Sequence, residues 1–237
     1  LSPNETTYLC LLKVFGALAE PEKGEEIHAE IKKARFADER GWLANALMEM
    51  YAKCGLLKKS QEVFEELRVR GIASWDVQIA SFIQHGQYEE ALRSFKDMHC
   101  QGIFPDAIIY LHILKAYACS GAIQKGKEIH AMIIREETLI LGCALVDMYA
   151  KCGALTEAQE VFDQLQSHDI VCWASLITGY TQHECLQEAV NCFEAMRHDG
   201  LSPDAAIFVC ILRACGGIGA IEKGMEIHGE IMREGFL

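Results

Sequence analysis

The chain has 237 residues, of which 51% are hydrophobic, and a formal net charge of −12 at pH 7. This length suffices for one globular domain or for an elongated array of repeats. No stretch reaches the roughly 18 uncharged apolar residues that a membrane span requires, so we expect a soluble protein without a membrane partner. The eleven cysteines are scattered and form no CxxC pair, which argues against a secreted disulfide scaffold; we interpret them as reduced thiols in small core positions.

Internal repeats give the first view of the architecture. KGEEIHAEI begins at Lys23, KGKEIHAMI at Lys125 and KGMEIHGEI at Lys223, which are spacings of 102 and 98 residues. YAKCG begins at Tyr51 and at Tyr149, again 98 residues apart. A fixed period of this kind predicts an array of structural units, here about 100 residues long.

Each unit divides into thirds, and each third contains an apolar helical run, a short turn with glycine and a second, amphipathic helical run. In chain order, the glycine turns include Cys54-Gly55, His85-Gly86, Ser120-Gly121, Cys152-Gly153 and Gly216-Gly219. The sequence therefore predicts an all-α protein of stacked helix-turn-helix repeats.

Three segments carry a family resemblance: NALMEMYAKCGLLKKSQEVFEEL, ILKAYACSGAIQKGKEIHAMII and IVCWASLITGYTQHECLQEAVNCFEAMRHDGLSPD. They resemble the S, L and P motifs of PLS-class pentatricopeptide repeat proteins, and the resemblance covers the whole chain. It implies a right-handed superhelical solenoid of antiparallel helix pairs. The motifs that it implies are L at 5–40, S at 41–71, P at 72–106, a short L at 107–138, S at 139–169, P at 170–204 and a partial L at 205–237.

The resemblance also implies a function, the binding of single-stranded RNA with one repeat per base. In the family, the fifth and last residues of an S or P motif contact the base edge, and the second residue packs on the base. The implied base-edge pairs are Asn45 with Gly71, Asp76 with Asp106, Cys143 with Asp169, and Ala174 with Asp204. The implied base-packing residues are Trp42, Ala73, Ile140 and Val171.

This readout is expected to be weak or degenerate. Cys143 and Ala174 cannot form a strong hydrogen bond to a base edge, and Asp76 facing Asp106 would bring two carboxylates together. The L motifs carry Leu9, Leu111 and Val209 at the fifth position, and these side chains cannot read a base edge. In the family, L motifs bind accessory editing factors, so an exposed apolar patch there would indicate a protein partner.

The acidity of the chain has to be compatible with RNA. The first helix of each third has few acidic residues, and Lys53 and Lys151 lie near the ends of two of them, where the resemblance implies contact with backbone phosphates. Most glutamates are in the second helices, as in EEIHAEI, SQEVFEEL, TEAQEVF and YEEALRSF. Two lysines release few counterions, so we expect modest, salt-sensitive affinity.

No motif predicts catalysis, a metal or another cofactor. His28-Ala29-Glu30 and His228-Gly229-Glu230 match half of a zinc-deaminase signature, but no PCxxC follows and the same histidine recurs as His130, so we interpret it as a packing or capping residue. Cys210 and Cys215 have a poor spacing for zinc. The resemblance implies that the chain is the RNA-recognition part of a mitochondrial or chloroplast C-to-U editing factor. The alternative is a helical-repeat scaffold for protein–protein interaction within an organellar assembly, which the acidity, Cys143 and Ala174 favour.

Overall fold

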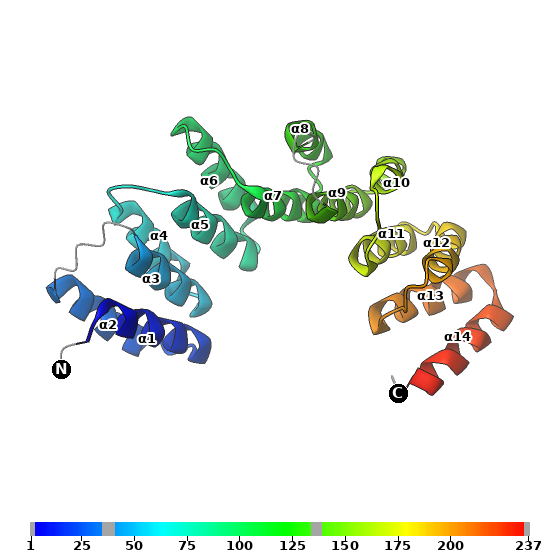
Figure 1. Ribbon diagram of the computed structural model, residues 1–237, viewed down its shortest axis with the longest axis horizontal. Helices are drawn as coiled ribbons and strands as arrows, with labels where there is room; N and C mark the ends of the chain where they lie inside the picture. The colour runs from blue at the N-terminus through cyan, green and yellow to red at the C-terminus, as the bar shows by residue number, and fades with distance from the viewer. Residues whose placement is uncertain (1–2, 35–40, 134–138, 235–237) are drawn as a thin grey trace. The chain divides into compact units, whose positions relative to one another are not determined.

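The computed structural model describes residues 3–34, 41–133 and 139–234. These residues form fourteen α-helices and no strand, which confirms the all-α prediction (Figure 1). In chain order, the helices are α1 (Glu5–Leu18), α2 (Pro21–Ala34), α3 (Trp42–Lys53), α4 (Leu57–Glu66), α5 (Ile72–Gln84), α6 (Tyr88–Cys100), α7 (Ala107–Ser120), α8 (Ile123–Ile133), α9 (Leu139–Lys151), α10 (Leu155–Gln164), α11 (Ile170–Gln182), α12 (Leu186–His198), α13 (Ala205–Ile218) and α14 (Ile221–Glu234).

One helix pair lies within each of the seven motif ranges predicted from the sequence, although the L, S and P types remain a prediction. The short motif at 107–138 contains α8, which has 11 described residues, whereas α2 and α14 have 14 each. The connection that follows, residues 134–138, lies outside the described residues. Among the described residues, no helix is long and apolar enough to cross a membrane.

The chain forms two compact units, residues 1–116 and 117–237. In the first unit, α1 packs against α3 and α3 against α5, and α2 and α4 each contact the first helix of their own pair and of the next. In the second unit, α9 packs against α11 and α11 against α13 in the same way, with α10 and α12 beside them. Within each unit, the first helices thus form one layer and the second helices another.

Tight turns join the helices of a pair. Gly55, Gly86, Gly121, Gly153 and Gly219 all have a positive φ, between 68° and 76°, as the predicted glycine turns require. Two turns use other residues in this left-handed region: Ala19, with φ 53°, ends α1, and Glu184, with φ 63°, follows α11. A left-handed backbone therefore ends these first helices even where the sequence has no glycine.

The recurring KGxEIH segment has a packing role. At Gly24 and Gly126, an added Cβ would lie 2.4 Å from the Met50 sulfur and 2.5 Å from the Met148 sulfur, so glycine lets the second helix approach the following first helix. The histidine Nδ1 of the same segment lies 2.8 Å from the Tyr51 hydroxyl in His28 and 3.0 Å from the Tyr149 hydroxyl in His130. Burial lowers the pKa of His28 and His130, which favours the neutral ring. The packing interpretation is confirmed for His28 and His130, whereas His228 of the third segment is exposed.

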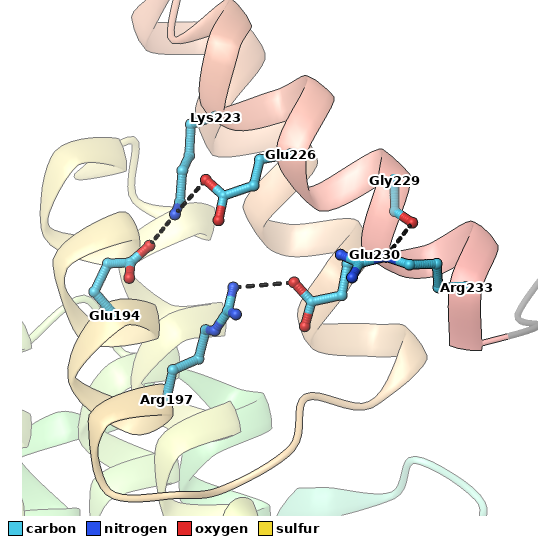
Figure 2. Close-up of polar contacts among 7 residues, drawn as sticks. All are labelled: Glu194, Arg197, Lys223, Glu226, Gly229, Glu230 and Arg233. Atoms are coloured by element: carbon cyan, nitrogen blue, oxygen red, sulfur yellow. Dashed lines mark hydrogen bonds and ion pairs between the residues drawn. The ribbon is translucent and has the colours of Figure 1, made fainter.

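Several acidic side chains of the second helices form ion pairs with the second helix of a neighbouring repeat. Lys32 pairs with Glu66, and Lys127 with Glu157. Figure 2 shows the equivalent contacts between α12 and α14, where Lys223 Nζ lies 2.6 Å from Glu194 and Arg197 lies 3.0 Å from Glu230. Part of the negative charge is therefore balanced within the second-helix layer.

Candidate nucleic-acid interface

The predicted base-packing and base-edge residues share one face of each first helix. The packing residue is the first or second residue of the helix, and the fifth motif position follows three residues later, as in Trp42 and Asn45 on α3 or Val171 and Ala174 on α11. Residues three apart are neighbours on a helix surface. The helical periodicity therefore places both kinds of predicted contact side by side near the start of α3, α5, α9 and α11.

The four predicted base-packing residues, Trp42, Ala73, Ile140 and Val171, are all exposed. The three larger side chains are Trp42, which is 52% exposed, Ile140, which is 66% exposed, and Val171, which is 58% exposed. Large apolar side chains near the start of a helix would gain stability from burial, and these remain on the surface. The exposed surface of each side chain could cover part of the face of a planar ligand such as a base.

The predicted last residues have a structural role as helix caps. The Oδ1 atoms of Asp106, Asp169 and Asp204 accept the backbone N–H of Ile109, Cys172 and Ile207, at 3.0, 2.9 and 2.8 Å. Gly71 is the corresponding N-cap residue of α5 and has no side chain to form this bond. The aspartates are exposed, so each cap carboxylate also lies at the surface.

Substitution tests whether the aspartate before α13 stabilises the protein as a helix cap. We expect Asp204→Ala to lower the free energy of unfolding by about 1 kcal/mol, because the Ile207 N–H loses its acceptor. Asp204→Asn retains an equivalent cap and should leave stability nearly unchanged. Urea denaturation measures both effects, and equal losses in the two variants would show that charge, not capping, stabilises this turn.

The fifth positions have different surroundings in the two units. Asn45 is half-buried, and its Oδ1 has no hydrogen-bond partner among the described residues. Asp76 Oδ1 lies 3.0 Å from the Nδ1 of His112 on α7, so this carboxylate is paired with an imidazole. Ala174 occupies the place equivalent to Asp76 and cannot form such a pair. A base at this position would therefore meet the polar Asp76 in the first unit and the apolar Ala174 in the second.

Cys143 corrects the interpretation of all cysteines as reduced thiols, because it forms a disulfide with Cys172. The bond joins α9 to α11, and the two residues are 5% and 0% exposed. The Cys143 sulfur lies 3.5 Å from Asp169 Oδ1, so the structure brings this predicted base-edge pair together. These two cysteines and Asp169 place possible metal ligands within 4.8 Å of one another, but sulfurs bonded to each other are not thiolates and cannot ligate a metal.

Both predicted phosphate-contacting lysines are exposed. Lys151 Nζ forms an ion pair with Asp147 one helical turn away, at 2.7 Å. Exposed pairs of this kind contribute little stability, so Lys151 can exchange Asp147 for a phosphate at small cost. The two lysines occupy the last residue of α3 and of α9, at the opposite end of each helix from the packing residues.

Other features lie away from these positions. A pocket of about 530 Å³ lies among α4, α5 and α6, and none of the predicted RNA-contacting residues lines it.

Among the fifth positions of the L motifs, Leu9 and Leu111 are half-buried and Val209 is 67% exposed. Of these three positions, only Val209 on α13 is exposed, and one side chain does not make the expected apolar patch.

Sequence reasoning did not identify His112 or Cys172. His112 belongs to no recurring motif and reaches Asp76 from a different helix pair. Cys172 is 29 residues from Cys143, and no sequence spacing indicates that these two cysteines pair. Only the stacking of first helices brings each residue to its partner.

Comparison with known proteins identifies the repeat. The PPR repeat model matches residues 43–72, 74–103, 143–170 and 171–201. In Arabidopsis thaliana, the chloroplastic pentatricopeptide repeat-containing protein CRR2 is 34% identical over 217 residues, covering 90% of this chain and 33% of that protein. The mitochondrial pentatricopeptide repeat-containing protein At3g09040 is 33% identical over 236 residues, covering 98% of this chain and 23% of that protein. These organelle names agree with the predicted mitochondrial or chloroplast address.

Solved structures show the same fold. The crystal structure of the pentatricopeptide repeat protein PPR10 from maize has a TM-score of 0.82 and 23% identity, over 99% of this chain and 34% of that one. PPR10 in complex with an 18-nt psaJ RNA element has a TM-score of 0.83, over 99% of this chain and 36% of that one. The chain thus spans about a third or less of the length of these proteins. The helix pairs, their recurring residues and the repeat matches, which together span half of the sequence, show that this chain belongs to the pentatricopeptide repeat family.

Proposed function

We propose that this chain binds single-stranded RNA along the first-helix layer of each unit. The observation that carries the proposal is the recurrence, on four first helices, of an exposed second-position side chain with a fifth-position residue one turn further along. Single-stranded RNA is recognised by contacts to base faces together with hydrogen bonds to base edges, and this arrangement can supply both. The structural likeness to PPR10, a protein solved with an RNA element, supports the proposal.

The charge distribution is compatible with this function. Acidic side chains of the second helices pair with lysine and arginine of neighbouring second helices. Lys53 and Lys151 lie at the ends of first helices. A phosphate approaching the first-helix layer therefore encounters a less acidic surface than the net charge of −12 suggests.

The lengths of the repeats support a subclass within the family. We propose that the repeats are of PLS type and form the RNA-recognition part of an organellar C-to-U editing factor, with no catalysis assigned to this segment. An accessory protein partner would contact the L motifs, where Val209 on α13 is the exposed fifth-position residue. RNA would be held by the S and P motifs.

The test is fluorescence anisotropy with a randomised single-stranded RNA pool at roughly 50 mM and 200 mM salt. We expect binding that weakens with salt. Lys53→Ala/Lys151→Ala should weaken it further and reduce the slope of log affinity against log salt by about 1.4, the contribution of two single-strand phosphate contacts. The control, Lys58→Ala/Lys125→Ala, removes the same charge from second helices and should retain most of the slope.

Two outcomes would contradict the proposal. If the control variant loses as much slope as the first-helix variant, net charge alone drives the binding. If no RNA binds at the lower salt, the scaffold function is favoured, and the search moves to protein partners of the L motifs.

A further inference from the structure

The Cys143–Cys172 disulfide lies within one of the predicted base positions. Cys143 is the fifth residue of its motif, three residues after the exposed Ile140, and Cys172 directly follows the exposed Val171. Their Cα atoms are 4.8 Å apart, within the range of about 4.4–6.8 Å in which two cysteines can be oxidised or reduced without backbone movement. The bond can therefore form and break with the helix packing unchanged.

The two redox states offer different chemistry to a ligand. A thiol has one weak S–H donor, whereas a disulfide sulfur has none. In the disulfide, both sulfurs are fixed in the interior, and Asp169 Oδ1 accepts the Cys172 backbone N–H at 2.9 Å. In the dithiol, the Cys143 side chain regains rotation about χ1, and its S–H can donate to Asp169 or to a group bound between Ile140 and Val171.

We propose that Cys143 and Cys172 form a thiol–disulfide site that withdraws this base position when oxidised and restores it when reduced. The inference rests on the proposed RNA-binding function. On oxidation, the two thiols lose two protons and two electrons to an external disulfide, which becomes two thiols, and the Sγ–Sγ bond forms. On reduction, a dithiol supplies the two electrons and two protons and leaves as a disulfide.

The first unit provides an internal reference. The residues 98 positions before Cys143 and Cys172 are Asn45 and Ser74, and this pair cannot form a covalent bond. Asn45 keeps an amide at its fifth position under all redox conditions. Oxidation is therefore expected to affect the position at Cys143 and to leave the position at Asn45 unchanged.

The experiment uses the 237-residue chain equilibrated in mixtures of reduced and oxidised dithiothreitol. Mass spectrometry of proteolytic peptides measures the fraction with the Cys143–Cys172 bond, and anisotropy with a randomised single-stranded RNA pool measures affinity in each mixture. We expect the reduced protein to bind about two- to threefold more tightly, the low end of the effect of one hydrogen bond because S–H is a weak donor, with the same midpoint as the cross-link.

Two variants isolate the site. Cys172→Ser retains the Cys143 thiol but cannot cross-link, so its affinity should equal that of the reduced wild type in every mixture. Cys119→Ser removes an exposed cysteine of α7 and should retain the full redox response. The thermal midpoint of each variant, compared with that of the reduced wild type, shows that it is folded.

Each result has a distinct meaning. RNA binding of equal strength in both states overturns the switch and leaves the proposed function in place. A redox response that persists in Cys172→Ser, or a cross-link that forms in no mixture, also overturns it. If the cross-link forms reversibly but RNA binds in neither state, the RNA-binding function fails, and the switch fails with it.

Discussion

Phe193→Ala is expected to lower the free energy of unfolding by about 3–5 kcal/mol, as measured by urea denaturation. Phe193 lies on α12 and is fully buried, and its ring centroid is 6.5 Å from that of Phe208 on α13. Truncation leaves a cavity between one helix pair and the first helix of the next. Since neighbouring pairs stabilise each other in a repeat protein, the loss would spread beyond α12.

The matched control is Val171→Ala in the preceding helix. This side chain is 58% exposed, so its truncation should change stability by no more than about 0.5 kcal/mol. If Phe193→Ala cost as little as Val171→Ala, the contact between α12 and α13 would not be part of a cooperative core.

Trp42→Ala should have the largest effect on RNA binding. Stacking of a base on an aromatic side chain contributes about 1–3 kcal/mol, so we expect affinity for single-stranded RNA to fall by about 5- to 150-fold. Trp42 is the largest of the four base-packing side chains and is 52% exposed on α3, so truncation also removes buried ring surface and should lower stability as well as affinity. Anisotropy measures the first quantity and urea denaturation the second.

Phe104→Ala provides the comparison for Trp42→Ala. Phe104 is 78% exposed but precedes α7 and lies outside the predicted base positions. Its loss should leave RNA affinity within about twofold of wild type, a difference of roughly 0.4 kcal/mol. If both variants lost affinity equally, exposed aromatic area in general, and not the second motif position, would be responsible.

The helix pairs were predictable from sequence because the same short-range signals recur. Each glycine turn meets the local need for a left-handed backbone, and the recurring Gly24 and Gly126 permit close helix approach at equivalent places. Ala19 and Glu184 show the limit of such signals, because both adopt the glycine conformation without being glycine. There, the packing of the flanking helices outweighs the local backbone preference.

The candidate site was predictable in position but not in chemistry. Helical periodicity placed Trp42 with Asn45 and Val171 with Ala174, as the family pattern implied. It could not reveal that Asp169 and Asp204 cap helices, because the cap depends on where each helix begins. Nor could it reveal that Asp76 pairs with His112, because that contact joins the first helices of two consecutive helix pairs and depends on how they stack.

The central claim is that bases of a single strand bind along the first-helix layers. The most direct measurement is the affinity of the chain for single-stranded RNA and for the same RNA annealed into a duplex, both by anisotropy at roughly 50 mM salt. A duplex keeps its bases stacked, so side chains such as Trp42 and Val171 cannot reach their faces. We expect at least about tenfold tighter binding of the single strand. Equal affinity for the two forms, or no binding of either, would contradict it.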